Sequence, residues 1–333
     1  MSSEVQRARV LLVGLGPTAG SALAALLERF EVVALVRDES DEVSALAAAA
    51  GVRVEHDTRI ADLEDLMDRT HPDCVVVSSY HRILPRALLN RCPFVNVHYA
   101  PLPRYRGRAN VNWAILNGEP EAAVTVHSMV PGLDAGGVLA QQSVPIADDD
   151  TVGTLYTRLN EVQRGILAGA VTRRLAGDEG DPQDEAHATY GCTRVPDDGE
   201  IDWRAGTVEI DRLVRALGAP YPGAFTFLGL RRLWVLQAEP APAPRTYDGR
   251  IPGRVIANSA DAGWADVLTG DGVLRLHRVH YDGGEPLPAS AVVHGSRQTL
   301  GLRTRDLLVR IDELEERLRD RLDASSHSPG SGG

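Results

Sequence analysis

Residues 9–36 read RVLLVGLGPTAGSALAALLERFEVVALV. An apolar run ends in glycine, and a glycine-rich turn, a stretch with helical periodicity and a second apolar run follow. Further apolar runs, DCVVV (73–77) and PFVNVH (93–98), extend the alternation of strand and helix. Runs that are apolar throughout, rather than alternating with polar residues, are typical of parallel strands covered on both faces. The sequence therefore predicts an α/β fold with a doubly wound, mostly parallel sheet.

The second part of the chain has a different pattern. Beyond residue 224 it carries short alternating runs separated by Gly, Pro and Asp, which indicate a small β-rich domain. The polar stretch GDEGDPQDEA (177–186) is typical of a linker. The predicted parts are an α/β domain over 1–205, a β domain over 206–302, a terminal helix over 303–323 and a disordered tail over 324–333.

Composition excludes several classes of protein. The formal net charge is -11, and all 35 basic residues are arginine. Without lysine the chain cannot carry out Schiff-base catalysis or form a P-loop nucleotide site. An acidic chain repels phosphate backbones, so a nucleic-acid partner is not favoured.

Cysteine content and hydropathy bear on the cellular location. Cys74, Cys92 and Cys192 are too few and too scattered for a disulfide framework or a zinc cluster. No segment reaches about 18 uninterrupted apolar residues, and residues 1–10 lack the apolar stretch of a signal peptide. We therefore expect a cytoplasmic protein with no membrane contact.

The turn GLGPTAG (14–20) resembles a dinucleotide-binding loop only in part. Ala19 stands where the third glycine of G-x-G-x-x-G belongs, and Pro17 removes an amide that a phosphate could use. The acid expected after the second strand is present only loosely, as Asp38. A tight turn between strand and helix is the favoured interpretation.

The segment NVHYAPLPRYRG (96–107) has more specific chemistry. Asn96 and His98 alternate with valines, so both side chains leave one face of a strand near its carboxyl end, where open parallel sheets bind ligands. An amide donor beside an imidazole suits a reaction that passes through an oxyanion. On spacing alone, it stays open whether these side chains only tie down the following loop.

Asp134 lies in VPGLDAGGVLAQ (130–141), a glycine-rich loop between two strand-like runs. A carboxylate there could orient His98 and balance its charge, although aspartate alone is more typical of a plain turn. His127 is interpreted as a packed histidine of a strand. His81 and Arg82 follow the DCVVV strand and could line a ligand site. No metal site is expected, because histidines and acids do not cluster along the sequence.

Taken together, three motifs resemble one enzyme family. Asn96-Val97-His98, LPRYRG (102–107) and LDAG (133–136) are similar to the hallmarks of the 10-formyltetrahydrofolate-dependent formyltransferases. Many members have Pro-Ser-Leu after the histidine, whereas this chain has Tyr99, Ala100 and Pro101. Three further segments resemble the formyltransferase domain of the bifunctional enzyme that modifies UDP-4-amino-4-deoxy-L-arabinose, namely residues 105–119, 191–203 and 220–225.

The resemblance implies a Rossmann-like formyltransferase domain, a C-terminal open β barrel, and a formyl group carried by 10-formyltetrahydrofolate without a metal. It implies that Asn96 and protonated His98 donate hydrogen bonds to an oxyanion while Asp134 keeps His98 charged. The residues it assigns to the folate are Tyr80, His81, Arg82, Ile83, Leu84, Asp134 and Val138. The residues it assigns to the acceptor are Arg106, Gly107, Arg108 and Asn112.

The acceptor stays open at this point. The favoured acceptor is a primary amine or hydroxylamine of a small molecule, either an amino sugar nucleotide or an amino-acid-derived amine. The alternatives are methionyl-tRNA formyltransferase, for which the acidic chain is a poor fit, and a formyltetrahydrofolate hydrolase, in which water replaces the amine. A folate-binding protein without enzymatic activity is a further alternative, which the intact triad disfavours.

The last predicted helix has a narrow apolar stripe, formed by Leu307, Ile311, Leu314, Leu318 and Leu322. Its other positions are mostly Arg, Asp and Glu, so the stripe must be buried somewhere for the helix to be stable. It either packs on its own domain or forms a homodimer through the C-terminal region.

Overall fold

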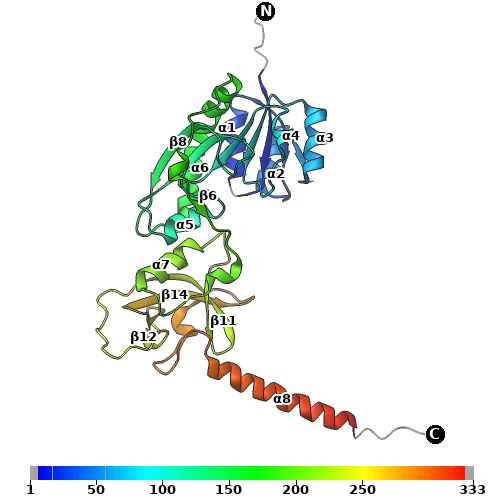
Figure 1. Cartoon of the computed structure of the whole chain (residues 1–333). Helices are drawn as coiled ribbons and strands as arrows, with labels where there is room; N and C mark the ends of the chain where they lie inside the picture. The colour runs from blue at the N-terminus through cyan, green and yellow to red at the C-terminus, as the bar shows by residue number, and fades with distance from the viewer. Residues whose placement is uncertain (1–6, 17, 57, 327–333) are drawn as a thin grey trace, which may run out of the picture. The chain divides into compact units, whose positions relative to one another are not determined.

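The computed structural model describes residues 7–16, 18–56 and 58–326 (Figure 1). The chain divides into two compact units, Met1–Arg194 and Val195–Gly333. This division falls before the boundary expected after residue 205, because Ile201 and Trp203 pack in the hydrophobic core of the second unit.

Among the described residues, the first unit contains a seven-stranded sheet in the order β3-β2-β1-β4-β5-β7-β8. The pairs from β3 to β5 are parallel, whereas β5–β7 and β7–β8 are antiparallel. The strands are β1 (Arg9–Gly14), β2 (Glu31–Val36), β3 (Arg53–Glu55), β4 (Cys74–Ser78), β5 (Phe94–His98), β7 (Glu121–Ser128) and β8 (Val138–Pro145). The predicted mostly parallel sheet is therefore confirmed.

Helices cover both faces of this sheet, as expected for a doubly wound fold (Figure 1). On one face Leu11 and Val13 of β1 pack with Leu63 and Leu66 of α3. On the other face α1 and α6 pack together, and a capping box at Thr151 begins α6. The helices of this unit are α1 (Ala19–Leu27), α2 (Glu42–Ala49), α3 (Ile60–Thr70), α4 (Arg86–Leu89), α5 (Asn110–Leu116) and α6 (Val152–Leu175).

The glycine turn after β1 is hydrogen-bonded and tightly packed by nearby residues of the first unit. The buried Arg37 side chain donates to the carbonyl of Gly14 at 2.9 Å and that of Gly16 at 3.4 Å. A Cβ atom added at Gly14 would lie 2.7 Å from the Cβ of Ala19. Glycine is thus needed here for close packing of strand and helix, in keeping with the interpretation as a tight turn.

The second unit is an antiparallel sheet in the order β10-β11-β14-β13-β12, with β15 paired to β14 and α7 (Thr207–Ala216) packed on β11. Single antiparallel bridges join Leu228 to Leu300 and Arg254 to Thr299. The two edges of the sheet, at β10 and next to β12, are thus both joined to Thr299 and Leu300, so the sheet curves towards a small barrel. Its strands are β10 (Ala224–Leu228), β11 (Arg231–Pro240), β12 (Val255–Ser259), β13 (Trp264–Leu268), β14 (Val273–Tyr281) and β15 (Leu287–Pro288).

The terminal helix α8 spans Thr304–Ser326. Residues 324–326 therefore continue the helix instead of belonging to the predicted tail, whereas residues 327–333 and the side chain of Leu322 lie outside the described residues. Within the described chain, no helix combines the length and apolar character required to cross a membrane.

Candidate active site

The candidate site lies where the sheet changes from parallel to antiparallel pairing. Asn96 and His98 leave the same face of β5, and the register of β5 with β7 places His127 directly opposite Asn96. Because directly opposite residues of an antiparallel pair share a face, these three side chains gather on one face of the sheet. The loop between β7 and β8 brings Asp134 to them, and the rings of His98 and His127 lie edge to face with centroids 6.4 Å apart.

His98 is buried, and its two ring nitrogens have different surroundings. Nε2 lies 2.8 Å from the carbonyl oxygen of Tyr105 and 3.0 Å from the side-chain amide of Asn110, whereas Nδ1 lies 3.6 Å from Oδ2 of Asp134. We assign the proton to Nε2 because its shorter contact is with the Tyr105 carbonyl, which can only accept; Nδ1 then keeps its lone pair, and Nδ2 of Asn110 contacts Nε2 without a hydrogen bond. Burial lowers the pKa of His98 below its ordinary value, although Asp134 acts in the opposite direction. Burial therefore favours the neutral form of His98 in the free protein, whereas the resemblance implied a protonated His98 during the reaction.

Asp134 is held in a left-handed backbone conformation, with φ of +48°. Its Oδ2 accepts from the backbone N–H of Gly107 at 2.8 Å, and its Oδ1 accepts from Nδ2 of Asn96 at 3.3 Å. Burial raises the pKa of Asp134, but His98, His127 and the Gly107 amide outweigh burial and hold it at about 2. The carboxylate is therefore ionised throughout the physiological range, in a conformation that non-glycine residues seldom adopt.

His127 belongs to the site, which the sequence interpretation as a packed histidine missed. The ring is buried, and its Nδ1 donates to the carbonyl of Ser128 at 2.8 Å. Nε2 is therefore free to accept from Nδ2 of Asn96 at 3.1 Å. His127 thus fixes which end of the Asn96 amide points to Asp134. Its place opposite Asn96 in the neighbouring strand is the signal that could have identified it.

The segment over 177–186 is not a linker, because it packs against the Asp134 loop. Nε2 of Gln183 donates to the carbonyl oxygens of Asp134 at 2.7 Å and Gly136 at 2.8 Å. Asp181 forms an antiparallel bridge with Val138. A Cβ atom at Gly137 would lie 2.4 Å from the carbonyl oxygen of Glu179, so the close approach of this segment requires glycine there. Gln183 therefore supports the backbone that presents the Asp134 carboxylate.

The residues assigned to the acceptor lie in different places. The guanidinium of Arg106 is buried and donates to Oε1 of Gln183 at 2.9 Å and Oε1 of Glu185 at 2.6 Å. Arg106 thus helps to hold Gln183 in place. An acceptor-binding side chain would face solvent, whereas the Arg106 side chain is buried. Gly107 contacts Asp134 through its amide, Arg108 is exposed, and Asn112 is buried in α5.

A cavity of about 170 Å³ is lined in part by Asn96, His127 and Asp134, whereas His98 is not part of its lining. Its lining also includes Tyr80, Arg82, Ile83 and Leu84, four of the residues assigned to the folate. His81 and Val138, which were also assigned to the folate, are not part of the lining. Two rim side chains, Ile83 and Leu133, are 81% and 54% exposed, so an apolar ligand could bury them.

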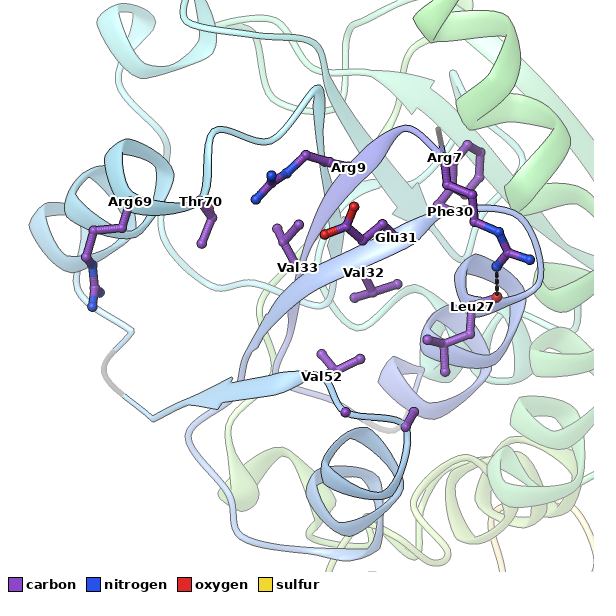
Figure 2. Close-up of a pocket in the computed structure, with 12 residues that line it drawn as sticks. Arg7, Arg9, Leu27, Phe30, Glu31, Val32, Val33, Val52, Arg69 and Thr70 are labelled. Carbon is purple, nitrogen blue, oxygen red and sulfur yellow. Dashed lines mark hydrogen bonds between the residues drawn. The ribbon is translucent and has the colours of Figure 1, made fainter. Parts of the chain in front are cut away.

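A second cavity, of about 560 Å³, lies at the amino-terminal ends of β1 and β2 (Figure 2). Val32, Val33 and Val52 lie between Arg69 on one side and Arg7 on the other. Although this cavity is larger, its lining contains none of the catalytic candidates, and we do not assign it a role. Among the described residues, no group of three His, Cys, Asp or Glu side chains is arranged to hold a metal ion.

Comparison with known proteins gives matches along both units. The formyl transferase family model matches residues 28–171, and the model of the formyl transferase C-terminal domain matches residues 195–297. A methionyl-tRNA formyltransferase from Marinobacter nauticus is 37% identical over 234 residues, which cover 69% of this chain and 73% of that protein.

Solved structures share the fold. HypX from Aquifex aeolicus, in complex with tetrahydrofolic acid, matches 87% of this chain with a TM-score of 0.66 and 19% identity. The chain spans about half of that protein, since the match covers 47% of it. WlaRD, a sugar 3N-formyl transferase solved with dTDP and 5-N-formyl-THF, matches 83% of this chain and 98% of its own, with a TM-score of 0.60 and 15% identity.

Proposed function

We propose the donor, the acceptor and the roles of the site residues from one premise: the chain belongs to the formyl transferase family. As a folate-dependent N-formyltransferase it takes the formyl group from 10-formyltetrahydrofolate. The acceptor is the amine or hydroxylamine of a small molecule.

One observation carries this proposal, namely that a partly apolar cavity ends at the ionised carboxylate of Asp134, the amide of Asn96 and the ring of His127. His98 lies next to this end of the cavity, with Nδ1 3.6 Å from Oδ2 of Asp134. The cavity residues Tyr80, Ile83 and Leu84 suit the aromatic part of a folate, and the backbone of the loop over 130–134, which lines the same cavity, suits its polar ring. The formyl group would then lie at the closed end, beside Asn96 and Asp134.

The geometry supports the following chemistry. The neutral acceptor amine attacks the formyl carbon, the new C–N bond forms and the carbonyl oxygen becomes an oxyanion. Asn96 donates to this oxyanion, which replaces Asp134 as the acceptor of its longer, 3.3 Å hydrogen bond. Nδ1 of His98 takes the proton from the amine, and Asp134 stabilises the imidazolium that forms. The bond to the folate nitrogen then breaks, and that nitrogen receives the proton.

Charge supports a small acceptor. The net charge of the chain is -11, and acids outnumber arginines within residues 195–333. A protein that binds the tRNA backbone gains affinity from a positive surface, which this composition does not favour. The exposed Arg108, beside Gly107 and its contact with Asp134, is placed to meet an anionic group of the acceptor. Within the family we propose the sugar-nucleotide branch, from the resemblance of residues 105–119.

Methionyl-tRNA is the second candidate acceptor. It is favoured by the 37% identity to the Marinobacter nauticus protein, which covers most of both chains. Water as acceptor, which would make the protein a formyltetrahydrofolate hydrolase, uses the same catalytic groups and is the third candidate.

A direct assay distinguishes the three acceptors. The protein is incubated with 10-formyltetrahydrofolate and, in separate reactions, with amino sugar nucleotides, amino-acid-derived amines and hydroxylamines, or methionyl-tRNA. We expect a formyl mass gain on one small acceptor, absent with His98→Ala. Formylation of methionyl-tRNA alone, or release of formate at the same rate without any acceptor, would replace our proposal by the second or third candidate.

A further inference from the structure

Four aliphatic side chains on one side of helix α8 are about half exposed. Their exposed fractions are 41% for Leu307, 50% for Ile311, 48% for Leu314 and 58% for Leu318. They are spaced four, three and four residues apart, which is the a/d spacing of a coiled coil. The helix therefore has a contact surface that the described chain leaves largely uncovered.

The register of this stripe indicates how many helices it suits. Ile311 and Leu318 occupy a positions, and Leu307 and Leu314 occupy d positions. The apolar stripe fills these four consecutive core positions, and the core positions that flank it are Thr304 and Arg321, so the paired segment is short. Ile311 is the β-branched a residue, and a β-branched residue at a between leucines at d favours two strands over three or four. We propose that two copies of this chain pair through α8 as a parallel, two-stranded coiled coil.

The charges beside the stripe select the parallel orientation. Within α8, Arg310 and Arg317 occupy g positions, and the e positions are Leu308, Glu315 and Leu322. In an antiparallel pair, g positions face g positions, so arginines would face arginines. In a parallel pair, each g position faces an e position of the next heptad, so Arg310 faces Glu315 of the partner subunit. Arg310 also pairs with Glu313 of its own helix at 2.9 Å, but an exposed pair of this kind is weak enough to rearrange.

A matched pair of variants tests the interface in the full chain. Ile311 and Val309 are each 50% exposed and β-branched, but only Ile311 lies at a core position of the coiled coil. Light scattering during size exclusion should give a dimer for the wild type and for Val309→Asp, and a monomer for Ile311→Asp. A wild-type monomer at about 100 µM, or equal effects of the two substitutions, would overturn the proposal.

Charge reversal tests the orientation. In the parallel pair, Arg310→Glu places two acids opposite each other, so the dimer dissociation constant should rise about tenfold at low salt. Arg310→Glu combined with Glu315→Arg should restore it. An antiparallel pair predicts the opposite sign for the single variant, because a clash between arginines is relieved. Helicity measured by circular dichroism controls for changes within α8. None of these measurements depends on formyl transfer.

Discussion

Two glycine-rich loops of the first unit follow strands of the central sheet, and of these two the loop over 130–137 contributes to the lining of the candidate site. The turn over 14–20 leaves little space for a ligand, because Arg37 donates a hydrogen bond to the carbonyl of Gly14 and Ala19 packs on Gly14. The loop over 130–137 is braced from behind by Gln183 and faces a cavity in front. In both loops glycine allows another part of the chain to approach the backbone closely. Whether a loop can also bind a ligand depends on which side of it that neighbouring segment covers.

The largest expected effect compares the loop over 130–137 with the turn over 14–20. Asp134→Asn keeps the shape of the side chain but removes the charge that stabilises the His98 imidazolium, so kcat should fall about a thousandfold or more. The matched control is Asp38→Asn, which alters the exposed acid that a dinucleotide site at the other loop would need. Steady-state formyl transfer measures both. A comparable loss in the two variants would contradict the division of roles between the loops.

The brace behind the loop should matter less than the carboxylate itself. Gln183→Glu replaces the amide donor by a carboxylate, removes two hydrogen bonds to the Asp134 and Gly136 carbonyls, and should lower kcat about 10- to 100-fold. Gln142→Glu makes the same change on an exposed position of β8 and should be silent. If Gln183 only supports the fold, its variant will lose thermal stability while the folded fraction keeps full kcat.

The neutral His98 gives a specific pH dependence. Since burial lowers its pKa below 6.5, the base form dominates at neutral pH in the free enzyme and is lost only on acidification. The profile of kcat/KM should therefore be flat near pH 7 and fall about tenfold per pH unit below an apparent pKa under 6.5. A profile that falls with an apparent pKa above 6.5 would mean that His98 is mostly charged in the free enzyme and would contradict its role as the base.

The smallest effect concerns stability alone. Gly14→Ala places a methyl group 2.7 Å from the Cβ of Ala19 and should destabilise the protein by about 1–3 kcal/mol. Gly20→Ala, whose Cβ meets only Val43 at 3.4 Å and lies within α1, should be neutral or slightly stabilising. Denaturant unfolding measures both, and neither should change the affinity for tetrahydrofolate.

The sheet, Asn96, His98 and Asp134 could be predicted from the sequence because they depend on local pattern and on short motifs. His127, Gln183 and the burial of Arg106 could not, since they depend on contacts between distant segments. Gln183 contacts a backbone 49 residues away. A polar stretch rich in Gly, Pro and acids has the composition of a linker whether or not it folds back on a loop.

Residues 178–191 pack back against the first unit, and this packing limits where a chimera between this protein and a relative can be joined. By composition, the segment is a natural junction for exchanging the C-terminal unit. It nevertheless contains Gln183, which supports the backbone of Asp134, and its Tyr190 and Gly191 pair with Arg106 and Gly107. A chimera joined there would inherit a foreign support for its own active site. A junction after Arg194, where the two units divide, would carry the complete catalytic unit into the hybrid.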